Sequence, residues 1–114
     1  MTVRNFNTVT IDDPGASGAI PVPLSHFQVN LVTATGESRT MGAPAFLGQR
    51  CLLAFKTDGG NATITIATTV NIAGNNTIIF TAIGQVVYMI GVSAGANFRW
   101  RTVLADPTSI LSTP

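Results

Sequence analysis

The stretch QVVYMIGVSAGANFRWRTVL, residues 85–104, is the clearest indicator of fold class in this chain. Residues 85–92 are rich in Val and Ile, which favour strands, and the turn sequence SAGAN joins them to a second strand as a hairpin. Side chains alternate between the two faces of a strand. We therefore expect one face to carry Phe98, Trp100, Thr102 and Leu104, and the other to carry Arg99, Arg101 and Val103. Trp100 is predicted to be a core residue, and the arginine pair an outward patch.

The rest of the chain has the same character. Thr, Val, Ile and Asn dominate, Gly or Pro recurs every several residues, and no long segment has helical spacing. This pattern is typical of an all-β sandwich or barrel. Further strands are expected at residues 26–34, 50–56, 62–68 and 77–83, and residues 39–49 are expected to be irregular. The predicted fold is an antiparallel β-sandwich, jelly-roll-like, with an extended N-terminal arm.

Three strands show which residues should form the core. Phe27, Val29 and Leu31 share one face of residues 26–34, and Ile64 and Ile66 point inward from residues 62–68. The segment RCLLAFK, residues 50–56, is apolar on both faces. It therefore predicts a central strand that is covered on both sides.

The N-terminal part differs in composition. Residues 1–24 contain DDPGASG, which favours a turn, and AIPVPL, whose prolines suit an edge or an extended segment. We expect residues 1–24 to form an arm and connection, in which Phe6 packs with Val9 or Ile11, and residues 25–114 to form the sandwich domain. Such an arm lies either on a neighbouring subunit or on its own sheet.

The low charge of the chain points to a covered surface. Only 10% of the 114 residues are charged, against about 25% in an average protein, and 46% are hydrophobic. Obligate interfaces resemble a domain core cut in half, so we expect other protein to cover much of the surface. A membrane protein is the competing explanation, but the apolar stretch 77–92 is shorter than the roughly 20 residues of a membrane span and is interrupted at Gly84. No membrane partner and no signal peptide are expected.

Few residues could carry chemistry. The net charge of +1 provides no basic field for nucleic acid, and one Cys and one His exclude a zinc site of the usual four ligands. Cys51 lies in the strand that is predicted to be the most buried, where a thiol is unreactive. Asp12 and Asp13 precede Pro14, which is a sequence typical of turns. We therefore expect no cofactor, no metal and no enzymatic activity.

The arginines remain as candidate binding residues. Arg99 and Arg101 point away from Trp100, so the three cannot line one groove for nucleic acid. Arginine is favoured at protein interfaces, and Arg4, Arg39 and Arg50 could add to a basic patch. The predicted partner interface consists of Arg4, Phe6, Arg99 and Arg101.

The C-terminal half, from Gly60 to Asp106, resembles small structural proteins of tailed bacteriophages. The resemblance rests on a Thr/Ile strand hairpin, the pattern G-x-x-V-x-x-I-G-V at Gly84–Val92, a Gly-rich turn, and the F-R-W-R segment with its Val-Leu end at Phe98–Leu104. It covers about half of the chain. The family it implies is the capsid decoration, or cement, proteins, which sit as small β-sandwiches on the outside of the head.

The resemblance implies a function without an active site. The expected role is to bridge and stabilise major capsid protein subunits, as a homo-oligomer (dimer or trimer), on the outer surface of a virion whose proteins are made in the host cytoplasm. Similar hairpins occur in tail-fibre and tail-spike domains, so a receptor- or glycan-binding β-domain is the alternative. A small cupin-like enzyme is disfavoured by the lack of metal-binding histidines.

Overall fold

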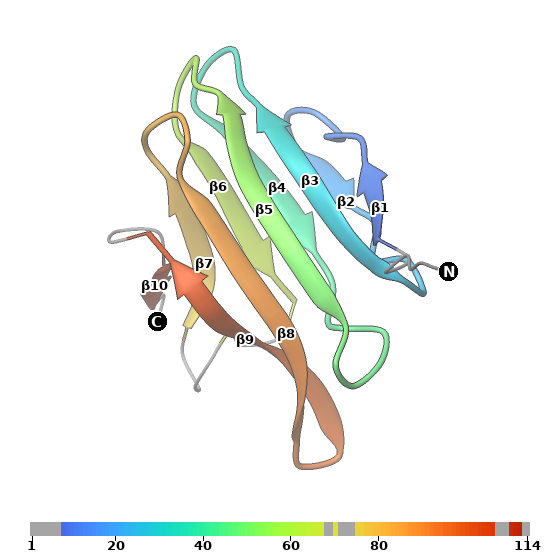
Figure 1. The fold of residues 1–114 in the computed structure, drawn as a ribbon. Helices are drawn as coiled ribbons and strands as arrows, with labels where there is room; N and C mark the ends of the chain where they lie inside the picture. Colours follow the sequence, from blue (N-terminus) through green and yellow to red (C-terminus); the bar gives the residue numbers. More distant parts are fainter. Residues whose placement is uncertain (1–7, 68–69, 71–74, 107–109, 113–114) are drawn as a thin grey trace.

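The computed structural model describes residues 8–67, 70, 75–106 and 110–112, which form ten strands and no helix. Figure 1 shows the strands in two facing layers, which we name sheet A and sheet B. Sheet A has the order β1-β3-β5-β8-β9 and sheet B the order β10-β7-β6-β4-β2. The strands are β1 (Thr8–Ile11), β2 (Gly18–Ile20), β3 (His26–Val32), β4 (Glu37–Met41), β5 (Arg50–Thr57), β6 (Ala62–Ile66), β7 (Asn75–Phe80), β8 (Val86–Ala94), β9 (Asn97–Ala105) and β10 (Ile110–Ser112). The all-β prediction is therefore confirmed, and the two layers make the fold sandwich-like.

The sheets are mixed, so the prediction of antiparallel sheets is wrong. From β1 to β6 each strand crosses to the opposite sheet, and the pairs β1–β3, β3–β5, β2–β4 and β4–β6 are parallel. A chain that crosses to the other sheet and back re-enters the first sheet in the same direction, which gives a parallel pair. The pairs β5–β8, β6–β7, β7–β10 and β8–β9 are antiparallel. The jelly-roll connectivity is not confirmed either, because jelly rolls are built from antiparallel pairs.

Trp100 is a core residue, as predicted. Its side chain is fully buried, its indole N–H donates to the Gly42 carbonyl at 2.9 Å, and its ring meets Phe27 edge to face with centroids 6.0 Å apart. The inward faces predicted for the strands at 26–34 and 62–68 are also confirmed, and one face of the strand at 50–56 is buried with them. Their buried side chains belong to one cluster that spans both sheets: Phe27, Val29, Leu31, Cys51, Leu53, Phe55, Ile64 and Ile66.

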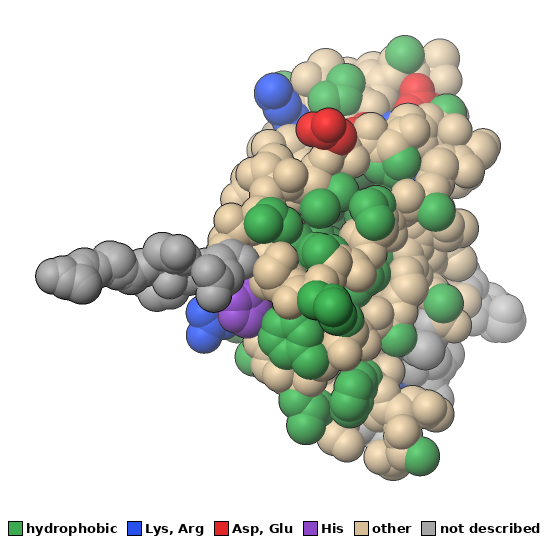
Figure 2. All heavy atoms as spheres, turned by 90° about the vertical axis from the view of Figure 1, so that its right-hand side faces the viewer, with side chains coloured by type: hydrophobic (Ala, Val, Ile, Leu, Met, Phe, Trp, Pro, Cys, Tyr) green, Lys and Arg blue, Asp and Glu red, His purple; other side chains and the backbone are tan. Residues whose placement is uncertain are grey.

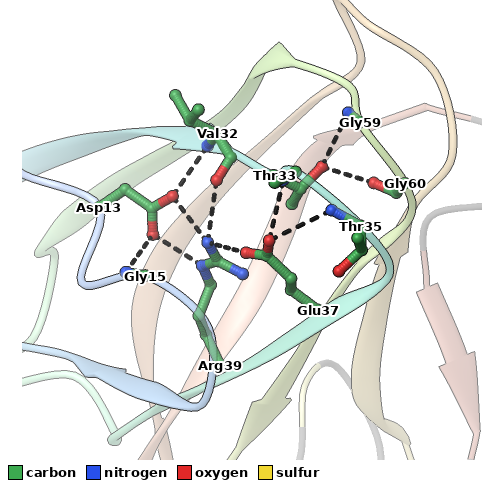
Figure 3. Close-up of polar contacts among 10 residues, drawn as sticks. Asp13, Gly15, Val32, Thr33, Thr35, Glu37, Arg39, Gly59 and Gly60 are labelled. Carbon is green, nitrogen blue, oxygen red and sulfur yellow. Dashed lines mark hydrogen bonds and ion pairs between the residues drawn. The ribbon is translucent and has the colours of Figure 1, made fainter.

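Arg39 is the one charged residue among the buried residues that the structure describes. It lies in a strand that the sequence analysis did not predict. Residues 39–49 were expected to be irregular, yet β4 covers Glu37–Met41 and turns Arg39 inward, where it is 1% exposed. Figure 3 shows Asp13 and Glu37 approaching its guanidinium from two sides. Asp13 lies 2.6 Å from Nε and Glu37 lies 2.9 Å from Nη2. Arg39 therefore ties the β1–β2 connection to sheet B and cannot join a surface patch.

Two strands lie within residues 1–24, the predicted arm and connection. β1 is the edge strand of sheet A and pairs with β3, while β2 is the edge strand of sheet B and pairs with β4. Ile11 lies against the core, but the predicted packing of Phe6 with Val9 or Ile11 is not tested. An extended N-terminal arm is not confirmed, and Arg4 and Phe6 lie outside the described residues.

Candidate protein-binding face

The candidate site is the side of sheet A that faces away from sheet B, which we call the outer face. Strand pairing aligns its side chains in two rows that cross the sheet. The first row runs Thr8, His26, Arg50, Ile90 and Arg101, and the second runs Thr10, Gln28, Leu52, Tyr88 and Leu104. The face thus mixes apolar and basic side chains over all five strands of sheet A.

Arg99 and Arg101 lie on this face, opposite in direction to Trp100, as predicted. Arg101 is exposed and pairs with Ile90, whereas Arg99 is half-buried and pairs with Val92. The ladder places Arg50 beside Ile90 on its other side. Arg50 and Arg101 therefore flank Ile90 across two strand spacings, roughly 10 Å apart.

Leu104 also lies on the outer face, which corrects its predicted position beside Trp100. The register between β8 and β9 shifts, so that Tyr88 pairs with Leu104 while Met89 pairs with Thr102. Val103 is the extra residue of this β-bulge, and one extra residue reverses the alternation beyond it. Leu104 is consequently 55% exposed beside Tyr88.

Leu52 was expected to be covered, and the structure places it on the outer face together with Tyr88. β5 is central in sheet A, as predicted, but only its inward side is buried. Leu52 and Tyr88 are half-buried and directly paired. The sequence misled here because β8 and β5 are apolar on both faces, which reads as burial on both sides.

A hollow of about 280 Å³ lies between the two rows, lined by Thr8, His26, Phe27, Gln28, Arg50, Leu52 and Tyr88. The backbone N–H of Arg50 donates to His26 Nδ1 at 3.0 Å. Because Nδ1 accepts this bond, the neutral imidazole carries its proton on Nε2 and donates from there. The His26 ring is held from behind by Phe46, with ring centroids 5.7 Å apart.

Charges are segregated along the molecule. His26 and Arg50 begin β3 and β5, whereas Asp12 and Asp58 follow the ends of β1 and β5, which run in the same direction. Asp106 follows β9, and β9 runs in the same direction as β5 because both strands pair antiparallel with β8. The Asp106 carboxylate accepts a hydrogen bond from the Val86 N–H. The remaining carboxylates, Asp13 and Glu37, bind Arg39 next to the loop that ends β3. All five carboxylates therefore lie toward one end, together with Arg39 and Lys56, whereas His26, Arg50 and Arg101 lie toward the other.

A second surface lies at the open edge between β1 and β2. Figure 2 shows hydrophobic side chains gathered on this edge of the molecule. A hollow of about 520 Å³ is lined here by Val9, Leu24, Ser25, His26 and Phe46, and Leu24 is 86% exposed. We call this surface the edge patch. Exposed apolar patches of this kind mark interaction surfaces.

The described residues contain no group of three or more His, Cys, Asp or Glu side chains that could hold a metal ion. In the same part of the chain, no helix is long and apolar enough to cross a membrane. No model of a known protein family matches the sequence. The sequence matches no curated protein.

Proposed function

We propose that the protein is a structural virion protein that binds the outside of a phage head and bridges major capsid protein subunits. The observation that carries the proposal is the outer face of sheet A, where Leu52, Tyr88, Ile90 and Leu104 lie among arginines in a chain with only 10% charged residues. The core of a protein interface is depleted in charge but enriched in aromatic residues and arginine. The resemblance of residues 60–106 to decoration proteins supplies the partner.

Stabilisation of the shell follows from mass action. A protein that binds only the assembled shell stabilises that state by its binding free energy. Many copies on one shell act together, and a subunit that bridges two capsid proteins gains from the high effective concentration of the second site. No active site and no cofactor are required for this role.

Self-association is part of the proposal, and the edge patch supports it. Leu24 is 86% exposed and Val9 is 40% exposed, beside Phe46 at the open side of the sandwich. A second copy of the chain that covers this patch would remove it from water in a dimer or trimer.

The edge patch has its own test. Leu24→Asp should shift the protein toward monomer in size-exclusion chromatography with light scattering, because it places a charge in the contact. Ile83→Asp is the matched control, since Ile83 is also exposed (66%) but lies in the β7–β8 connection. Equal masses for all three proteins would remove the edge patch from the proposal.

The alternative is a receptor- or glycan-binding domain of a tail fibre or spike. One observation favours it: Tyr88, the only tyrosine, faces outward at a hollow that also contains Gln28 and Arg50. Aromatic rings and hydrogen-bonding side chains together are suited to sugar rings. This reading assigns the same face to a different ligand.

Co-sedimentation with capsids that lack the protein distinguishes the two functions. Saturable binding and a raised capsid rupture temperature are expected. Leu104→Asp on the outer face should abolish binding, whereas Thr65→Asp, at an exposed outward position of β6 in sheet B, should not. Absence of binding to capsids together with binding to glycans or cell surfaces would refute the capsid role and favour the tail.

A further inference from the structure

The hollow on the outer face of sheet A has the chemistry of an anion site. Its polar lining consists mainly of donors: the guanidinium of Arg50, the Nε2–H of His26, and the hydroxyl of Thr8, with the amide of Gln28 beside them. Arginine carries only donors and matches a carboxylate in a bidentate fork. The geometry points to a carboxylate-binding site in this hollow.

The donors are positioned by the sheet itself. His26 and Arg50 are the first residues of two adjacent parallel strands, and the 3.0 Å bond from the Arg50 N–H to His26 Nδ1 orients the imidazole. A ring held at Nδ1 presents Nε2–H in one direction, so the site does not have to order it upon binding. Arg50 and His26 can therefore bind one carboxylate together.

The floor of the hollow selects what is attached to that carboxylate. Leu52 and Tyr88 are half-buried neighbours across the β5–β8 ladder, and both line the hollow. These side chains offer apolar contact to a short aliphatic stem. The ligand class is consequently a carboxylate on a few methylene groups, as in a glutamate side chain.

None of the carboxylates in the described residues lies near the hollow. The two ion pairs found in the described residues both involve Arg39, which lies inside the molecule. The five carboxylates lie toward the end of the molecule opposite to the hollow. An incoming carboxylate would meet Arg50 in the hollow and Arg101 on the far side of Ile90. Like and unlike charges set partner choice and association rate across an interface, so the partner surface should be acidic there.

A glutamate or aspartate side chain of a protein partner is the source that we infer. An acidic sugar such as a uronic acid carries the same carboxylate directly on its ring and has no aliphatic stem to pack against Leu52. The methylene groups of a glutamate side chain supply that apolar contact. The inference deepens the proposed function and uses the same face, but it does not need a capsid to be tested.

NMR titration of the full-length protein is the test, with N-acetyl-glutamate amide as the probe. The Arg50 amide signal should shift saturably, because this N–H is bonded to the imidazole that contacts the ligand. N-acetyl-glutamine amide, which has the same shape without the charge, should bind at least about tenfold more weakly. Glucuronate should also bind more weakly than the glutamate probe.

Two variants distinguish binding in the hollow from general electrostatic attraction to the basic face. Arg50→Gln should weaken binding of the glutamate probe about tenfold or more, whereas Arg101→Gln, outside the hollow, should change it less than threefold. Equal loss in both variants, or no saturable shift in the unmodified protein, overturns the carboxylate site. Tighter binding of glucuronate than of the glutamate probe overturns the protein source and favours the glycan alternative.

The two proposals can fail separately. Capsid binding without a response to the glutamate probe overturns the carboxylate site and leaves the virion role in place. A specific response to the probe without capsid binding overturns the virion role and retains the site.

Discussion

Replacing Asp13 by Asn should destabilise the protein by about 2–3 kcal/mol, because two hydrogen bonds to the carboxylate are lost while Arg39 keeps its ion pair with Glu37. Asp13 Oδ1 accepts from the Gly15 N–H (3.1 Å) and from Arg39 Nε–H (2.6 Å). Oδ2 accepts from the Val32 N–H (2.8 Å) and from Arg39 Nη2–H (2.8 Å). Asparagine has a single acceptor oxygen, so in either orientation its NH₂ group faces two donors. Two of the four bonds are lost, and the buried guanidinium keeps only a neutral partner on that side.

The assay is urea unfolding at pH 7, followed by the fluorescence of buried Trp100. Asp12→Asn is the matched control, because it removes the same charge from the exposed neighbouring residue, and it should stay within about 0.5 kcal/mol of the unmodified protein. A difference of less than 1 kcal/mol between the two variants would refute the structural role of the Asp13–Arg39 pair.

The same contact predicts a pH dependence. Burial raises the pKa of Asp13, but the hydrogen bonds from Arg39, Val32 and Gly15 outweigh it, so this pKa lies below its ordinary value of 3.8. A carboxyl whose folded-state pKa is lowered contributes stability that is fully present above the unfolded pKa and is lost as the pH falls through the folded one. The difference between the unmodified protein and Asp13→Asn should therefore narrow below about pH 4. A difference that is constant down to pH 2 would contradict this.

Three further predictions concern the core. Gly91→Ala should lower the free energy of unfolding in urea by roughly 1–3 kcal/mol, because the new Cβ would lie 2.7 Å from Pro44 Cβ and 2.9 Å from the Phe46 carbonyl oxygen. Gly36→Ala is the control and should leave that free energy nearly unchanged, because its Cβ meets open space. Trp100→Phe should cost about 1–3 kcal/mol, measured by circular dichroism, because it leaves the half-buried Gly42 carbonyl without its indole donor and puts a smaller ring in a fully buried site. Burial raises the pKa of the Cys51 thiol, so a thiol reagent should label the protein only in denaturant, and labelling of the native protein at the denatured rate would show that β5 is exposed.

Alternation along strands predicted most of the core correctly. Phe27, Leu53, Ile64 and Trp100 are all buried as expected, because a side-chain period of two depends only on the local backbone. The same reasoning predicted that Arg99 and Arg101 share the outward face. It could not decide which sheet a strand joins, since parallel and antiparallel partners bury the same inward face. The mixed topology was missed for this reason.

The errors at β4 and at the outer face have local causes. β4 has the sequence ESRTM, in which the inward residue is an arginine, so the pattern of apolar alternation fails at the one position where an ion pair replaces an apolar side chain. The β-bulge at Val103 moved Leu104 to the outer face, and an extra residue in one strand leaves no mark in the sequence of that strand alone. The hollow was beyond prediction because it joins His26, Arg50 and Tyr88 from three strands.

The alternation of the first six strands between the two sheets also determines how the fold would yield to force. β1 and β2 form the outermost coil of this winding, and each is held along only one side by a single neighbour. A force applied at the N-terminus would detach β1 and β2 before it acted on the β8–β9 hairpin. The salt bridge between Asp13 and Arg39 would oppose this detachment. Behind these two strands, β3 and β4 would become the next edges of the same two sheets, but the loss of β2 would also remove the buried Ile20 from the core.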